Sequence, residues 1–423
     1  MPILESPEAQ MLLSDATLEP QHLVSCRRQL QRFLDRYLPL FYRVEQSHNA
    51  TIVIEGLLSD LARKTCEPIA RREGVERKPI QFFVGAGKWD DEAVLAEYRR
   101  QVVAACGDPQ GVLIVDPSAF PKKGHASCGV KRQWCGRLGK IENCQVGVFL
   151  AYATPRGCAF LDRQLYLPED WAADPERRAK TPVPPATVFQ TKIQMATAML
   201  AAHGAAVPHA WVVAADEFGR SAEFRARLRE SHERYLLDVP CDTLIRDLAV
   251  RRPPRQNSGA GRMRQTPWRR VDAWLQRQPP ERWERITIRA GEKGPLTVDA
   301  LSARVRARQD QRAGDEERLL VLRDGADPAI VRFALSNAAA EVPLADLARA
   351  ACERHRIEEL FQAGKGEAGL AQYELRSWVG WHHHMTLVFL ALWFVTLERR
   401  RLGEKKTGDH RAADTPVVLS VAS

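Results

Sequence analysis

The stretch GVLIVDPSAFPKKG, residues 111–124, decides how the fold of this chain is interpreted. It contains four apolar residues in a row, the pattern of a strand buried on both faces, and Asp116 stands where the run stops. A second such run, AWVVAAD at 210–216, also ends in an aspartate, Asp216. Because aspartate also caps ordinary strand-to-loop turns, each residue alone is open to two interpretations, a catalytic carboxylate or a turn cap.

The segments around these two runs predict an α/β core. Further strands are expected in NCQVGVFLAYATPRG (143–157) and CAFLDRQLYLP (158–168), which a Pro-Arg-Gly turn joins. A helix is expected over 186–205, and helical periodicity returns from residue 343. Strands that lie side by side with helices between them indicate one sheet with helical cover.

Two flanking regions differ from this core. Residues 20–105 have apolar positions at helical spacing, which predicts an all-helical N-terminal region. Residues 239–342 contain short β-like pieces and, at 251–270, a stretch with seven arginines and no acid. The run MTLVFLALWFVTL, 385–397, has 13 residues and is too short to span a bilayer comfortably, so we expect a buried core helix and no membrane association.

The composition sets looser bounds. A length of 423 residues predicts two or three domains, and the net charge of +9, mostly from arginine, fits a polyanionic partner. Nine cysteines without a C-x-x-C pair predict reduced thiols in a cytoplasmic protein. The first 20 residues lack the basic segment of a signal peptide, so none is expected.

A third carboxylate is found in ACERHRIEELFQAGKGEAGL, residues 351–370. On one continuous helix, Arg354, Glu358 and Lys365 fall within about 40° of one another. An acid between two cations suits a metal ligand flanked by phosphate-contacting groups. The alternative is a solvated face with pairing between Arg354 and Glu358, and two glycines, 364 and 366, leave open whether the helix reaches Lys365.

Together these segments resemble the DDE transposases of bacterial insertion sequences, in particular the group typified by insertion sequence 701. The likeness covers roughly 25–400. The stretches that carry it are GLLSDLARKTCEPIA, VDxxxFPKKG (115–124), GRLGKIENCQVGVFLAYATPRG, LYLPEDW, VVAADEFGR and RIEELFQAGKGEAGLAQYELRSWVGWHHHMTL.

The resemblance implies an RNase H-like fold and a catalytic trio. It assigns Asp116, Asp216 and Glu358 to two Mg²⁺ (or Mn²⁺) ions that serve cleavage at the element's ends and joining of the freed 3′-OH to target DNA. Glu358 sits in a Y-x2-R-x3-E-x6-K signature, in which Arg354 and Lys365 match. The chain departs from the family at the tyrosine, which is Ala351 here, at Pro117-Ser118 in place of Glu-Thr, and at His355 in place of a frequent tryptophan.

Double-stranded DNA is the expected partner, both as terminal inverted repeats and as target, bound by a homodimer. The basic residues after the first strand, with Trp134 among them, are expected in one loop that forms a backbone groove, the alternative being a solvated loop. The residues expected to contact DNA are Arg354, Lys365, Lys122, Lys123, Arg132, Arg137, Arg262 and Arg264.

The expected domains are a helical N-terminal DNA-binding domain (1–107), a first part of the RNase H-like core (108–238), a β-rich insertion (239–342), C-terminal core helices (343–402) and a disordered tail (403–423). Two alternatives stay open: a catalytically inactive, transposase-derived DNA-binding protein, favoured by Ala351, and a plain RNase H-like nuclease. The triple histidine 382–384 is not expected to bind metal, because successive helical residues point about 100° apart.

Overall fold

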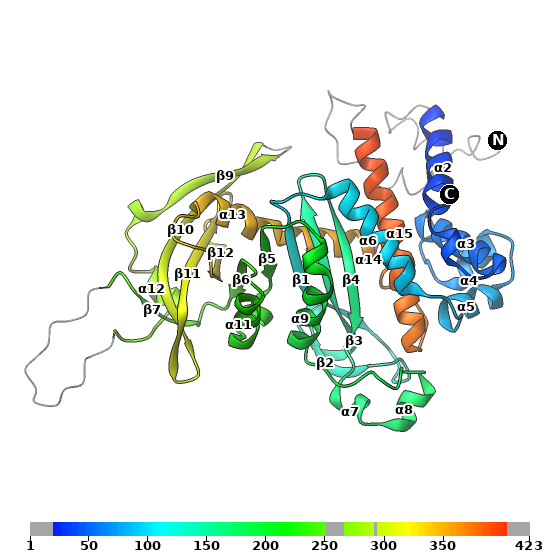
Figure 1. The fold of residues 1–423 in the computed structure, drawn as a ribbon, viewed down its shortest axis with the longest axis horizontal. Helices are drawn as coiled ribbons and strands as arrows, with labels where there is room; N and C mark the ends of the chain where they lie inside the picture. Colours follow the sequence, from blue (N-terminus) through cyan, green and yellow to red (C-terminus); the bar gives the residue numbers. More distant parts are fainter. Residues whose placement is uncertain (1–19, 251–265, 292–293, 404–423) are drawn as a thin grey trace, which may run out of the picture. The chain divides into compact units, whose positions relative to one another are not determined.

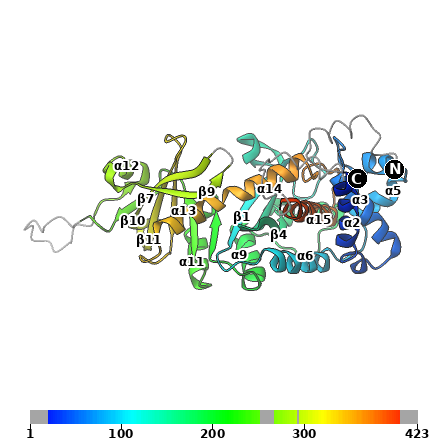
Figure 2. The same cartoon turned by 90° about the horizontal axis from the view of Figure 1, so that it is seen from above.

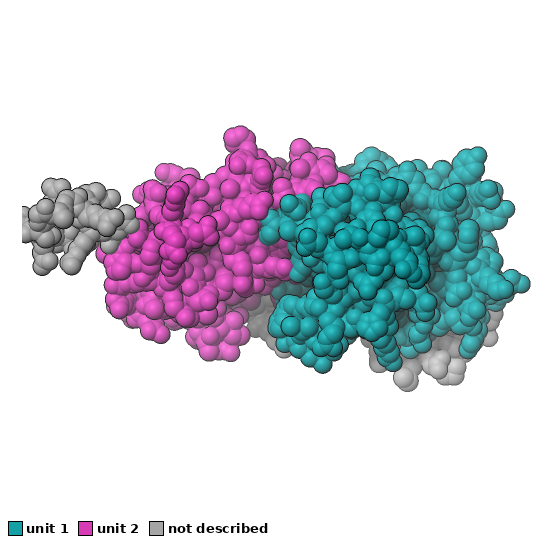
Figure 3. Space-filling model, turned by 90° about the horizontal axis from the view of Figure 1, so that it is seen from below, with its two compact units in different colours: residues 1–107, 117–195, 357–423 teal, residues 108–116, 196–356 magenta. Residues whose placement is uncertain are grey.

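The computed structural model describes residues 20–250, 266–291 and 294–403 of the chain. These residues form two compact units (Figure 3). Unit 1 comprises 1–107, 117–195 and 357–423, and unit 2 comprises 108–116 and 196–356. The predicted tail at 403–423 lies outside the described residues except for its first residue, and Arg262 and Arg264 lie outside them as well. The domain boundaries stay a prediction.

Unit 1 combines the N-terminal helices with a small antiparallel sheet and the last long helix (Figure 1). Strand β3 pairs antiparallel with β2 at one end and with β4 along the rest of its length. The elements are α2 (Pro20–Leu34), η2 (Leu38–Leu40), α3 (Val44–Leu58), α4 (Cys66–Arg72), α5 (Arg77–Gly85), α6 (Asp91–Cys106), β2 (Lys131–Cys135), η3 (Gly136–Leu138), β3 (Lys140–Thr154), β4 (Gly157–Leu165), α7 (Glu169–Ala172), α8 (Pro175–Lys180), α14 (His355–Gly366, from Ile357 on) and α15 (Trp378–Gly403).

Helix α15 is the core of unit 1. It contacts α2, α3, α5, α6 and β4, and its long apolar run is buried. Figure 2 shows α6 running beside it. Phe389, which is fully buried, stacks on Phe160 of β4 with ring centroids 4.8 Å apart and also contacts Tyr98 of α6. The expected buried core helix is therefore confirmed. None of the helices in the described residues combines the length and apolar character that crossing a bilayer requires.

Unit 2 is dominated by strands. Their hydrogen-bonded order is β1-β5-β6-β12-β11-β10-β7-β8, with β9 also on β10. The elements are the first part of β1 (Val112–Pro121), α9 (Lys192–His203, from Ala196 on), η4 (Gly204–Ala206), β5 (Trp211–Ala214), α10 (Asp216–Gly219), α11 (Ala222–Glu230), β6 (Tyr235–Val239), β7 (Leu244–Asp247), β8 (Arg269–Arg270), α12 (Val271–Leu275), η5 (Pro280–Arg282), β9 (Glu284–Gly291), β10 (Gly294–Gln309), β11 (Arg312–Asp324), β12 (Val331–Ser336) and α13 (Leu344–Glu353).

The short β-like pieces expected within 239–342 include strands β9, β10, β11 and β12, which extend the sheet of unit 2 and do not form a separate one. β12 pairs antiparallel with β6, and Val239 of β6 shares one apolar cluster with Leu301, Val321 and Trp274. The β-rich region is therefore continuous with the strands that follow Asp216.

Strand β1 belongs to both units, because the unit boundary falls after Asp116. Its first half pairs with β5, and along the sheet β1 also neighbours β3. The order β4-β3-β1-β5-β6, with antiparallel β3–β4 and parallel β1–β5 and β5–β6 pairs, describes a mixed α/β protein. It is consistent with the RNase H-like core that the resemblance implies.

Three expectations of local structure need correction. The basic segment after β1 is not one loop, because Lys131–Cys135 form strand β2 on the edge of β3. The helix expected over 186–205 is shorter, Lys192–His203. Arg354, Glu358 and Lys365 do not share one continuous helix, because Arg354 is the C-cap of α13 and the other two residues belong to α14. Helix α14 does continue through Gly364 to Gly366, so Lys365 is helical.

Replacing Phe389 by alanine tests the core of unit 1. Loss of a fully buried ring that contacts three other aromatic rings, those of Phe160, Tyr98 and Phe149, should cost about 3–5 kcal/mol of stability. Urea unfolding followed by tryptophan fluorescence measures the change. Phe82→Ala on α5, where the ring is 65% exposed, is the matched control and should shift stability by less than about 0.5 kcal/mol. Equal losses for both variants would contradict the assigned core.

Candidate active site

The parallel pairing of β1 with β5 positions two of the predicted carboxylates in unit 2. Its register matches Val112 with Trp211 and Val115 with Ala214, and both apolar runs are buried. Asp116 directly follows Val115, and Asp216 comes two residues after Ala214. Strand β1 continues past Asp116 to Pro121, so Asp116 lies within the strand and not after it, directly beyond the four residues that pair with β5. Because the two paired segments run parallel, Asp116 and Asp216 both follow the carboxyl end of the β1–β5 pairing.

Asp216 is the first residue of α10, and its surroundings fix that short helix closely. A Cβ on Gly219 would come within 1.9 Å of the carbonyl oxygen of Asp238 on β6, so only glycine permits this approach. Arg220, four residues after Asp216, donates to its Oδ2 at 2.7 Å. Sequence reasoning missed Arg220, although the four-residue spacing in DEFGR is a usable signal.

Asp238 is a second carboxylate that sequence reasoning did not single out. Its Oδ2 lies 2.8 Å from Nε of Arg354 and 3.1 Å from the guanidinium of Arg332. Arg332 also donates to the carbonyl of Ala351, at 3.2 Å. The signature arginine is therefore anchored to β6 by an ion pair, and Ala351, in the tyrosine position, is buried on α13.

In unit 1, α14 carries Glu358 and Lys365. Glu358 is exposed in the first turn, while Lys365 Nζ donates to Ser118 Oγ at 2.7 Å. The ammonium group also lies 5.6 Å from the ring centroid of Phe120. Lys365 thus ties α14 to Ser118 and Phe120 in the second half of β1.

The predicted trio is divided between the units: Asp116 and Asp216 belong to unit 2 and Glu358 to unit 1. Within the described residues, no group of three or more His, Cys, Asp or Glu side chains is placed to hold a metal ion. The donor set itself suits a hard divalent cation, because such ions prefer carboxylate oxygens. Assignment of a metal to these three residues is therefore a proposal.

The predicted DNA-contacting residues after β1 have different environments. Lys122 Nζ lies 3.5 Å from the ring centroid of Tyr373 and 3.3 Å from its carbonyl oxygen, and burial lowers the pKa of this lysine to about 8. Lys123, Arg132 and Arg137 are exposed. In the arginine-rich segment, Trp268 is covered by Arg246, whose guanidinium carbon lies 4.0 Å from the ring centroid.

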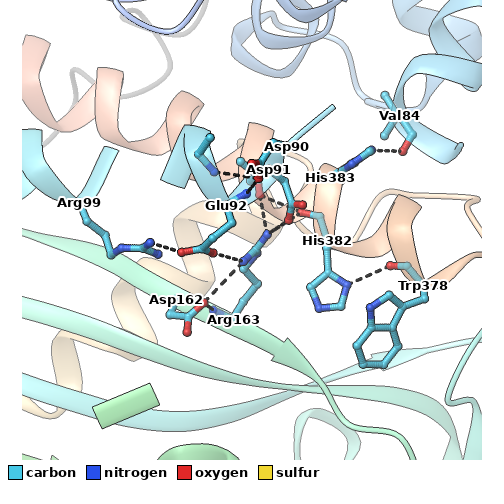
Figure 4. Close-up of polar contacts among 12 residues, drawn as sticks. Val84, Asp90, Asp91, Glu92, Arg99, Asp162, Arg163, Trp378, His382 and His383 are labelled. Atoms are coloured by element: carbon cyan, nitrogen blue, oxygen red, sulfur yellow. Dashed lines mark hydrogen bonds and ion pairs between the residues drawn. The ribbon is translucent and has the colours of Figure 1, made fainter. Parts of the chain in front are cut away.

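The three histidines 382–384 each bond a different backbone carbonyl. Figure 4 shows the contacts of His382 and His383. His382 Nδ1 bonds the carbonyl of Trp378 at 2.9 Å, His383 Nδ1 that of Val84 at 3.2 Å, and His384 Nε2 that of Gly369 at 3.0 Å. Burial lowers the pKa of all three imidazoles. They are neutral at physiological pH and do not converge on one ion.

Beside His382, a buried arginine joins three elements of unit 1 (Figure 4). Arg163 of β4 pairs with Asp91 at the start of α6 and with the neighbouring Asp162, and donates to Thr386 Oγ1 of α15 at 2.8 Å.

All nine cysteines are free thiols and five are buried, as expected for reduced cysteines.

A protein-family model and a known protein match parts of this chain. The family model for the DDE superfamily endonuclease matches residues 36–295, a range that includes both aspartates and excludes Glu358. A probable transposase for insertion sequence element IS701 from Microchaete diplosiphon is 30% identical over 122 residues. That match covers 28% of this chain and 32% of the relative, so it spans about a third of the relative's length.

The lowered pKa of Lys122 predicts a pH-dependent stability. In the folded chain the amine loses its proton near pH 8, whereas in the unfolded chain it keeps it up to its ordinary value of 10.5. The folded state therefore gains stability relative to the unfolded state as pH rises through this window. Lys122→Met should be more stable than the wild type at pH 7, and the difference should shrink by pH 10.

Urea midpoints at several pH values measure this difference, with Lys123→Met, at the exposed neighbouring position, as the baseline. An effect of Lys122→Met that stays constant between pH 7 and 10 would show that Lys122 is not buried as a charged amine.

Proposed function

Because the chain belongs to the DDE superfamily of endonucleases, we propose that it is a DNA transposase that cleaves at the ends of its own insertion sequence and joins the 3′-OH ends to target DNA. The observation that carries this proposal is the pair of aspartates, Asp116 and Asp216, that follow the paired segments of β1 and β5 at the same end of their pairing. The partial likeness to a probable insertion-sequence transposase supports transposition over a general nuclease function. The core of this enzyme would be RNase H-like, built from β4, β3, β1, β5 and β6.

Asp116, Asp216 and Glu358 would together hold two divalent metal ions, Mg²⁺ or Mn²⁺. When bound, such ions activate the attacking oxygen and stabilise the departing one in phosphoryl transfer. Three carboxylates near one another repel and favour a bound cation over an empty site. In the structure Arg220 supplies positive charge to Asp216, at an ion pair whose two side chains are about half exposed. Such a pair is weak enough for Asp216 to exchange this partner.

The predicted cations outside the trio would contact the DNA backbone. Exposed cations after β1, among them Lys123, Arg132 and Arg137, would contact phosphates without reading sequence. Arg354 and Lys365 are anchored to Asp238 and Ser118, so they would bring their charge to the DNA from fixed positions. Arg262 and Arg264, which lie outside the described residues, are also proposed to contact DNA. The protein would bind DNA as a homodimer, in the cytoplasm.

The second candidate is a catalytically inactive DNA-binding protein derived from such an enzyme. The observation that favours it is Ala351, which replaces the signature tyrosine and is buried on α13. A buried alanine at this position cannot offer a hydroxyl to a DNA end. Cleavage of DNA that carries the inverted repeats flanking the gene separates the two candidates.

Single substitutions of the trio test the catalytic assignment. Asp116→Asn, Asp216→Asn and Glu358→Gln should each reduce cleavage on the order of a thousandfold, because each loses a charged oxygen ligand. DNA affinity, measured by gel shift, should persist. Glu217→Gln and Glu359→Gln, each next to a trio residue in sequence, are matched controls that should keep activity. Wild-type cleavage by any trio variant would refute that residue's role.

Metal removal is an independent test of the same proposal. Treatment with EDTA should abolish cleavage of end-bearing DNA, and added Mg²⁺ or Mn²⁺ should restore it, because carboxylate sites exchange such ions reversibly. Cleavage rates are followed on denaturing gels. Activity that persists in excess EDTA would exclude the metal-dependent mechanism.

A further inference from the structure

The hairpin of β2, η3 and β3 in unit 1 has exposed apolar side chains. Trp134 is 61% exposed and Ile141 is 60% exposed, and the two residues lie opposite each other in the β2–β3 register. Leu138, in the turn between the strands, is 45% exposed. An exposed tryptophan beside two exposed aliphatic residues marks a contact surface.

One face of this hairpin joins Trp134 to positive charge. Residues directly opposite in an antiparallel pair share a face, so Arg132 and Asn143 lie on the face of Trp134 and Ile141. The Asn143 amide donates to the carbonyl oxygens of Lys122 and Gly124, at 2.7 and 2.9 Å. Residues 122–124, with the exposed Lys123 between the two bonded carbonyls, are thereby held at the base of the same face.

The charges of the hairpin are sorted between its two faces. Lys131 pairs with Asp170 at 2.8 Å and Lys140 with Glu142 at 3.2 Å, and in the register both lysines belong to the opposite face. Within the described part of the chain, Arg132 and the turn residue Arg137 form no ion pair with a carboxylate. The exposed guanidinium groups of Arg132 and Arg137 therefore accompany Trp134.

The tip of the hairpin is sterically open. Gly139 closes the turn with φ +61°, and nothing lies within 4 Å of the position of a Cβ there. The same is true at Gly124, at the base of the face. Protein atoms therefore do not crowd the chain at these two glycines, and the indole of Trp134 itself is 61% exposed.

We propose that this hairpin is a stacking platform on which Trp134 holds an unpaired base of the DNA, while Arg132 and Arg137 contact the adjoining phosphates. The inference deepens the proposed function, since it rests on DNA being the substrate. An indole stacks on any base, and an unpaired base exposes the π-face that a duplex conceals. A second copy of the chain is a poorer occupant, because a symmetric contact would bring the same positive charges together.

The test compares Trp134→Ala with the wild type in binding to two DNA probes of equal duplex length, one fully paired and one with a short single-stranded overhang. Fluorescence anisotropy is measured in EDTA, so no cleavage is needed. The variant should lose about tenfold in affinity for the overhang probe and little for the paired one. Trp134→Phe, which keeps an aromatic ring, should recover most of the loss, and Phe82→Ala is the control for removal of an exposed ring.

A 2-aminopurine placed in the overhang reports stacking directly. Its emission should be quenched by the wild type and by Trp134→Phe, and not by Trp134→Ala. Arg132→Gln with Arg137→Gln should reduce the dependence of affinity on salt by about one to two phosphate contacts, whereas Lys140→Gln, on the opposite face, should leave it unchanged.

Three outcomes would overturn the proposal: no loss for Trp134→Ala, an equal loss on both probes, or a change of oligomeric state with unaltered DNA binding. The proposed function can fail separately. If the chain does not cleave but prefers overhangs through Trp134, the platform stands and the transposase proposal does not. If the Trp134→Ala variant cleaves at the wild-type rate and binds the overhang probe with wild-type affinity, the transposase proposal stands and the stacking platform does not.

Discussion

The parallel hydrogen-bonded pairing of β1 with β5 is the interaction on which the site depends. Both strands are apolar and buried, so a shift of register by one residue would turn each side chain to the opposite face of the sheet. The observed register places Asp116 and Asp216 at the same end of the β1–β5 pairing. Two carboxylates from positions 100 residues apart thereby acquire a shared location that neither sequence stretch has alone.

Groups around this end of the pairing hold the neighbouring elements in place. The contact of Gly219 with Asp238 presses α10 against β6, and Asp238 in turn anchors Arg354 at the end of α13. In unit 1, Lys365 fastens α14 to β1 through Ser118. The signature cations Arg354 and Lys365 are thus structural contacts as well as charges.

Apolar periodicity predicted β1, β3, β4, β5 and the buried α15, because burial on both faces leaves a strong pattern. It missed β2, since KRQWC is an edge strand with mostly exposed polar residues. The environment of Lys122 could not be predicted, because the ring beside it, Tyr373, is 251 residues away in sequence. The same distance effect concealed Asp238 as the partner of Arg354.

The claim that Asp116, Asp216 and Glu358 hold one metal centre is tested most directly by iron-dependent cleavage of the polypeptide. Fe²⁺ can occupy a carboxylate site for Mg²⁺ and, with ascorbate and peroxide, cuts the backbone beside it. Mass spectrometry of the DNA-bound protein should find cuts next to all three residues, competed by Mg²⁺ and lost in Asp116→Asn. Cuts confined to other segments, or an unchanged pattern in that variant, would contradict the account.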